Sequence, residues 1–151
     1  MKLNKKESSF LKLLNKHSVK YLIVGGMAVE HFIPSRKRKD IDIWVEANES
    51  NANNIIKAIE LLIGVIPKLT TDKLSKENVH FPLSKLGYNI DILTSLQRVS
   101  YSFSEAYESS ETHTIEGIFI SFIGKDKLIE SKLSANESKD IEDVKLLKKY
   151  V

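Results

Sequence analysis

The chain of 151 residues contains no cysteine, so disulfide bridges, zinc–thiolate centres and thiol nucleophiles are excluded. It also lacks any apolar run near the roughly 18 residues needed to cross a membrane. Lysines interrupt the first twenty residues too often for the apolar core of a signal peptide. Internal repeats and low-complexity tracts are missing as well. These absences predict a cytoplasmic protein with no membrane partner.

What the chain does contain is typical of one domain over residues 1–151. Apolar residues make up 42% and charged residues 28%, which are ordinary values for a soluble globular protein. The formal net charge of +3 is mild, but four positive charges stand together at residues 36–39. A loop with such a basic cluster is usually solvated. Contact with nucleic acid is an alternative that this cluster leaves open.

Hydrophobic periodicity predicts a chain that mixes helices and strands. Apolar spacing and capping residues indicate helices over residues 5–16, 27–32, 50–63, 103–108, 125–134 and 138–149. Apolar or alternating runs indicate strands over residues 19–24, 40–46, 79–83, 88–93 and 118–123. The polar connector after Pro67 fits neither pattern. The order predicts a mixed α and β domain with an N-terminal helix, a core over about 19–123 and C-terminal helices over about 125–149.

The strand expected over residues 40–46 carries acidic residues on one face. Asp40 and Asp42 are two apart, so their side chains point the same way and their backbones lie about 6.5–7 Å apart. Asp91 occupies a similar position on another strand. Carboxylates suit Mg²⁺, and three of them on neighbouring strands would suit a two-metal site. Taken alone, the Asp40–Asp42 pair is equally consistent with a solvated sheet face.

Gly25 and Gly26 end an apolar strand and precede a helix. A helix N-terminus offers backbone N–H groups and a favourable dipole to an anion, and glycine lets a phosphate approach the backbone closely. Arg36, Arg38 and Lys39 bring positive charge that would neutralise a triphosphate or another polyanion. A two-glycine turn by itself is usually only a turn, so the prediction depends on the combination and order of these features.

The segment GGMAVEHFIPSRKRKDID, residues 25–42, resembles the signature of the DNA polymerase β-type nucleotidyltransferase superfamily: a glycine pair, a short helix and then D-x-[DE]. More narrowly, it is similar to small AbiEii-like prokaryotic nucleotidyltransferases, which commonly read GG-x-A and then R-x-T-x-D-I-D. The residues that match this signature are Gly25, Gly26, Ala28, Arg36, Asp40, Ile41 and Asp42. Asp91 matches a third carboxylate that these enzymes carry on a later strand. The residues that match the family's C-terminal tail are Lys132, Lys139, Asp140, Asp143 and Leu146. The resemblance covers roughly residues 18–147.

Two positions depart from the family pattern. Arg38 stands where a threonine is usual two residues before the first aspartate, and Glu137 replaces an arginine of the tail. Neither change removes a metal ligand. Both affect how a nucleotide or an acceptor is held, so the resemblance predicts the fold more strongly than the substrate.

The resemblance implies an α+β fold of the polymerase β palm-like kind, with a mixed sheet of about five strands flanked by helices. It implies that Asp40, Asp42 and Asp91 hold two Mg²⁺ ions and that Asp91 helps to deprotonate the acceptor hydroxyl. The residues expected to hold the nucleotide are Gly25, Gly26, Arg36, Arg38 and Lys39, with Lys132 and Lys139 as accessory residues.

The implied reaction moves an NMP from an NTP onto a hydroxyl acceptor and releases pyrophosphate. A protein side chain or a tRNA end is favoured over an antibiotic as acceptor. A cognate toxin or antitoxin is a further expected partner, in a toxin–antitoxin or phage-defence system. The alternative is a catalytically inactive antitoxin or binding module that keeps the fold and acts through protein contacts.

The remaining candidate residues are better explained by structural roles than by catalysis or binding. The four histidines, at positions 17, 31, 80 and 113, show no metal-ligand spacing, although His31 merits attention because it ends the helix after the glycines. Trp44 shares the aspartate face and would more often form core than stack on a base. Asp140 and Asp143 extend the acidic set or simply complement a helix dipole.

Overall fold

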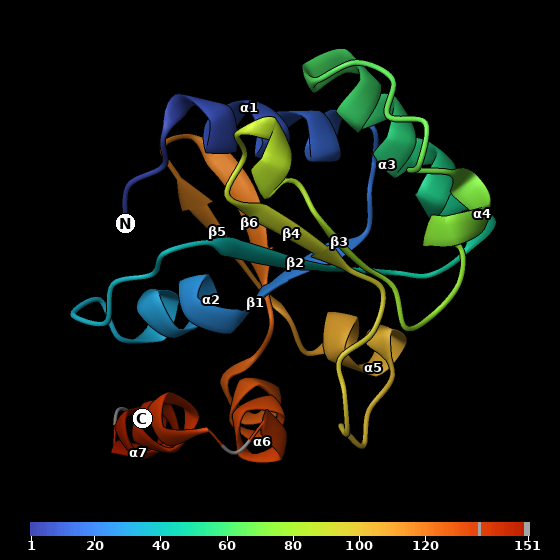
Figure 1. The fold of residues 1–151 in the computed structure, drawn as a ribbon. Helices are drawn as coiled ribbons and strands as arrows, with labels where there is room; N and C mark the ends of the chain where they lie inside the picture. Colours follow the sequence, from blue (N-terminus) through green and yellow to red (C-terminus); the bar gives the residue numbers. More distant parts are fainter. Residues whose placement is uncertain (136, 150–151) are drawn as a thin grey trace.

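The computed structural model describes residues 1–135 and 137–149, and its centre is a six-stranded mixed sheet with the order β3-β4-β2-β1-β6-β5 (Figure 1). The strands are β1 (Tyr21–Val24), β2 (Ile41–Val45), β3 (His80–Pro82), β4 (Ile90–Leu93), β5 (Glu111–Ile115) and β6 (Ile118–Phe122). The helices are α1 (Lys5–Lys16), α2 (Gly25–Phe32), α3 (Glu49–Leu62), α4 (Thr71–Leu74), the 3-10 helix η1 (Ser84–Leu86), α5 (Phe103–Glu108), α6 (Lys125–Ala135) and α7 (Ser138–Lys149). The predicted α+β fold class is confirmed.

The middle of the sheet consists of β1 and β2, which run antiparallel. Each has a parallel neighbour on its outer side, β6 beside β1 and β4 beside β2. The edge strands β3 and β5 run antiparallel to β4 and β6. Figure 1 shows α1 and α3 on one side of the sheet and α2, α5, α6 and α7 on the other. Because both faces are covered at the centre, all four residues of β1 are buried.

Polar side chains fix the layer formed by α1 and α3. Asn4 and Glu7 form a reciprocal capping box at the start of α1. The buried amide of Asn51 on α3 accepts a hydrogen bond from the Lys20 N–H and donates to the carbonyl oxygens of Lys20 and Glu46. This side chain thereby satisfies backbone groups next to β1 and β2. The two central strands and α3 are held together at that end.

Most elements agree with the ranges expected from periodicity to within one or two residues, and three features differ. The helix after the glycines begins at Gly25 itself rather than at residue 27. The sheet has a sixth strand, β5, which periodicity does not reveal because its three central residues are all exposed at an edge. The four-residue helix α4 lies in the connector after Pro67. Among the described residues no helix is long and apolar enough to cross a membrane.

Candidate nucleotide and metal site

The parallel pairing of β2 and β4 brings two of the expected carboxylates side by side. Asp42 is in register with Asp91, between the buried pairs Ile41–Ile90 and Ile43–Ile92. Since side chains alternate along a strand, both aspartates project from the face opposite these isoleucines. Both are half-buried, whereas Asp40 lies just before β2 and is exposed. The structure thus unites Asp42 and Asp91, whereas Asp40 is close enough to raise the pKa of Asp42 but does not complete a compact group of three carboxylates.

The charge on Asp42 is poorly compensated. Its pKa is raised from 3.8 to about 6, mainly by burial and then by the negative charges of Asp91 and Asp40 and a hydrogen bond with Asp91. Lys132 acts in the opposite direction but does not cancel these effects. A nearby positive charge would favour the ionised carboxylate. The group therefore has the electrostatic character of a cation-binding site.

Gly25 faces Asp42 and has a conformation that other residues avoid. Its φ angle is +63°, and a Cβ atom at this position would collide with the Asp42 carboxylate. Both facts require glycine here. The start of α2 has no side-chain cap, because its N-cap residue is Val24, so its first N–H groups stay available for an anion. A Cβ atom on Gly26 would make only an ordinary contact, 3.6 Å from the Cβ of Arg38.

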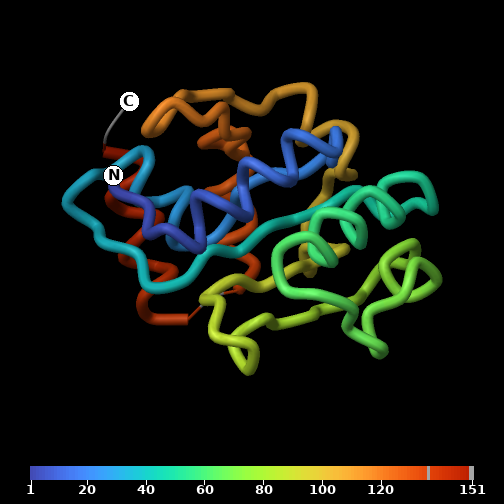
Figure 2. The backbone as a smooth tube through the Cα atoms, turned by 90° about the horizontal axis from the view of Figure 1, so that it is seen from above, coloured from blue at the N-terminus to red at the C-terminus, as the bar shows by residue number. Residues whose placement is uncertain are grey.

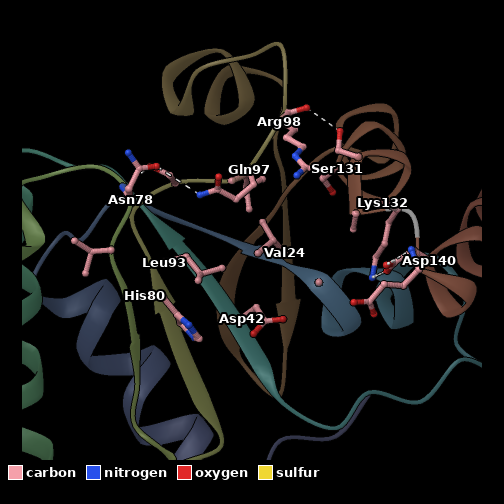
Figure 3. A pocket seen from close by; sticks show the side chains of 17 residues that line it. Val24, Asp42, Asn78, His80, Leu93, Gln97, Arg98, Ser131, Lys132 and Asp140 are labelled. Atoms are coloured by element: carbon pink, nitrogen blue, oxygen red, sulfur yellow. Dashed lines mark hydrogen bonds and ion pairs between the residues drawn. The ribbon is translucent and has the colours of Figure 1, made fainter.

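Two cavities meet at Asp42 and Gly25. The first, of about 600 Å³, lies between β3 and β4 on one side and α6 on the other (Figure 3). The second, of about 480 Å³, lies between the 36–40 loop and the α6–α7 pair, where Lys39 and Lys139 are exposed. Asp42, Gly25 and Lys132 line both cavities. A reactant in each cavity would therefore meet its partner at Asp42.

Several of the predicted basic residues are engaged in ion pairs within the protein. The Arg36 Nε donates to an oxygen of Asp143 at 2.7 Å. Lys132 Nζ lies 3.4 Å from both Asp140 and Asp143, whose side chains are almost fully buried. We call these four residues the α6–α7 clasp. The clasp attaches the C-terminal helices to the loop that follows α2, and Lys132 also faces Asp42.

Arg38, the residue that departs from the family pattern, contacts α1. Its two terminal nitrogens each donate at 2.8 Å to an oxygen of Glu7, and one also donates to the carbonyl of Lys2. Its backbone N–H donates to the buried Glu30. The Arg38 side chain is only 10% exposed. The guanidinium therefore joins the loop to α1 in this structure, and its predicted role in nucleotide binding remains a prediction.

The first cavity also contains residues that the sequence interpretation missed. His80 Nε2 lies 3.7 Å from an oxygen of Asp91, because the β3–β4 register puts His80 opposite Leu93 on the same face as Asp91. Arg98 lines the same cavity (Figure 3). Neither residue belongs to a recognisable motif, so no sequence signal marks them. Trp44 is buried against Tyr101 and Phe103, as a core residue.

Comparison with known proteins bears on the fold. The chain superposes on the crystal structure of an antigenic nucleotidyltransferase-like protein from Paracoccidioides brasiliensis with a TM-score of 0.61 and 17% sequence identity, over 94% of this chain and 74% of that chain. No family model matches the sequence, and no curated protein matches it. The chain therefore has a nucleotidyltransferase-like fold.

Proposed function

We propose that the protein transfers a nucleoside monophosphate from an NTP onto a hydroxyl acceptor with the help of Mg²⁺. The observation that carries this proposal is the register of Asp42 with Asp91 directly beneath the Gly25 turn. It puts poorly compensated carboxylates next to an uncapped helix N-terminus. Carboxylates attract a divalent cation and the helix attracts a phosphate, which are the two requirements of metal-assisted phosphoryl transfer.

The donor set fits magnesium. Asp40, Asp42 and Asp91 supply oxygen ligands only, and the pKa of Asp42 is raised by burial and then by the negative charges of Asp91 and Asp40, which Lys132 offsets only in part. Bound Mg²⁺ would supply charge neutralisation at the phosphates. Because Mg²⁺ keeps several water ligands and binds through one or two carboxylates plus phosphates, an exposed Asp40 beside the half-buried pair is compatible with this role.

The remaining roles fall to the chain itself. The first N–H groups of α2, at Gly25 and Gly26, would hold the triphosphate, with Lys39 and Lys139 contributing charge from the second cavity. Asp91 would accept the proton of the acceptor hydroxyl. The hydroxyl oxygen bonds to the α-phosphorus as the bond to the bridging α–β oxygen breaks, and pyrophosphate leaves. We propose a macromolecular acceptor, a protein or tRNA, and a toxin–antitoxin context on the strength of the family resemblance alone.

The test is transfer of label from each α-³²P-labelled NTP, with Mg²⁺, to total protein, total tRNA or an aminoglycoside. Wild type is compared with Asp42→Asn and with Asp72→Asn, which makes the same change at an exposed carboxylate on α4. We expect label transfer from wild type and Asp72→Asn, and a strong loss of transfer in Asp42→Asn. Equal signals from all three proteins would contradict the proposal. An inactive binding module would instead show no Mg²⁺-dependent nucleotide affinity in calorimetry.

The glycine pair supplies a second, matched test. Ala at position 25 would need a positive φ, which costs about 1–2 kcal/mol, and its methyl group would displace Asp42. Ala at position 26 meets no such obstacle. We therefore expect Gly25→Ala to lower the free energy of unfolding and to lower label transfer by at least about tenfold. Gly26→Ala should preserve stability. Thermal unfolding and the transfer assay measure both, and equal tolerance at the two positions would show that Gly25 does not shape the site.

A further inference from the structure

A second group of metal-binding side chains lies outside both cavities of the carboxylate site. We propose that His31, Glu111 and His113 form a binding site for a divalent transition ion of the Zn²⁺ class. One ligand atom from each residue lies within 4.8 Å of the other two, which holds for no other group of three or more His, Asp or Glu residues among 1–135 and 137–149. The proposal is independent of the nucleotidyl-transfer function.

Two different elements converge to make this group. Glu111 and His113 are two apart on β5, so their side chains share a face of the edge strand. His31 comes from the last turn of α2, where its ring stacks on Phe122 of β6 with centroids 4.1 Å apart and an interplanar angle of 14°. The centroid of the stacked His31 ring lies 4.3 Å from the centroid of the His113 ring. The fold, rather than a sequence motif, therefore assembles the ligands.

The ligand chemistry selects the ion. Two imidazoles and one carboxylate form a typical set for Zn²⁺, and three protein ligands leave a fourth position for water. With metal–ligand distances of about 2.0–2.2 Å, tetrahedral ligand atoms lie roughly 3.3–3.6 Å apart. His113 Nε2 and Glu111 Oε1 are already 3.5 Å apart. Mg²⁺ prefers oxygen ligands only, so this site and the carboxylate site would sort the two ions by ligand type.

A metal bound here would connect two elements of the fold. Bound Zn²⁺ would join the end of α2 to the edge strand β5. Since α2 begins at Gly25, the ion would fasten the far end of the helix that shapes the carboxylate site.

The test is a Zn²⁺ titration of untagged protein against a chromophoric chelator, in millimolar Mg²⁺ to occupy the carboxylate site. The proteins are wild type, His31→Gln, His113→Gln, and two controls, His80→Gln and Asp91→Asn. The controls change His80 and Asp91, a second histidine–carboxylate pair near the first cavity that would compete for Zn²⁺. We expect one Zn²⁺ per wild-type chain, at least tenfold weaker binding in the His31 and His113 variants, and unchanged binding in both controls. Wild-type affinity in the His31 and His113 variants, or loss of binding in the controls, would overturn the proposal.

Two further measurements give readouts that do not depend on the affinities alone. Co²⁺ should give the intense visible bands of a four-coordinate N/O site with wild type and not with His113→Gln. Zn²⁺ should raise the melting temperature of wild type in a concentration-dependent way, and the His31 and His113 variants should lose this shift while keeping a wild-type circular dichroism spectrum. Melting shifts of equal size in all five proteins would also overturn the proposal.

Discussion

Two neighbouring acidic groups in this protein are balanced in opposite ways. Asp140 and Asp143 are almost fully buried but lie against Arg36 and Lys132 in the α6–α7 clasp. Asp42 and Asp91 are more accessible yet face each other and Asp40, with Lys132 as partial compensation. Burying charge without compensation destabilises a fold. The clasp therefore serves stability, whereas the carboxylate site tolerates repulsion that a bound cation would relieve.

The first and largest expected effect separates these two roles directly. Asp42→Asn should reduce nucleotidyl transfer roughly 10²–10³-fold, the scale seen when one preorganised electrostatic group is removed. It should leave the metal-free protein at least as stable as wild type, because it removes a repelled charge. Asp143→Asn should instead lower the free energy of unfolding, because Arg36 and Lys132 lose a buried partner. Transfer assays and urea unfolding measure both quantities, and a stability loss in Asp42→Asn would contradict the distinction.

The second prediction concerns the lysine that both groups share. Lys132→Met should lower the free energy of unfolding by about 3 kcal/mol, since it leaves Asp140 and Asp143 buried with less positive charge. The matched control is Lys76→Met, which breaks an exposed pair with Asp72 and should change stability by less than about 0.5 kcal/mol. Urea unfolding of both variants checks the prediction, and equal midpoints would contradict a stabilising role of Lys132 in the clasp.

The third prediction asks whether Arg38 stabilises the fold through Glu7 or contacts the substrate. Its bidentate pair with Glu7 is nearly buried, so a double-mutant cycle of Arg38→Met and Glu7→Gln should give a coupling energy of about 1–3 kcal/mol. We expect KM for the NTP to change equally in the two single variants. A larger rise in KM for Arg38→Met would instead support the direct nucleotide contact predicted from the sequence.

The fourth and smallest effect is a pH dependence of stability. The pKa of Asp42 is about 6 in the folded protein against 3.8 for an unperturbed aspartate, so the folded state binds the proton more tightly. Asp42 therefore destabilises the metal-free fold fully above pH 6, and this effect disappears as the pH falls towards 4. The stability difference between wild type and Asp42→Asn should widen from pH 4 to pH 6 and then stay constant. A pH-independent difference would contradict the raised pKa.

Much of this arrangement follows from the sequence, because local patterns determine it. The alternation around Asp40 and Asp42 indicates a strand with an acidic face, and the paired glycines indicate a turn into a helix. These features predicted the fold class. The pairing of β2 with β4 joins two parallel strands that are far apart in the chain, and no hairpin turn between them fixes which strands pair or in which register. The structure was needed to show that Asp42 and Asp91 are neighbours.

The residue pairs that sequence analysis missed share one property: only tertiary contacts bring their members together. Glu7 looks like an ordinary capping residue, yet it also holds Arg38. His31 and His113 are widely separated in sequence, and the strand that carries His113 has no apolar alternation to reveal it. A propensity or spacing rule cannot detect such partners. The expected site residues remain predictions until the transfer assay is done.

The register of Asp42 with Asp91 also has a kinetic consequence. These residues are far apart in the chain, so β2 and β4 can pair only after a long loop has closed, and such non-local contacts slow folding. The same step brings two like charges together. We therefore expect metal-free Asp42→Asn to refold faster than wild type above pH 6, with the two rates converging in acid. During synthesis, the carboxylate pair cannot form before β4 has left the ribosome, and Lys132 follows later still.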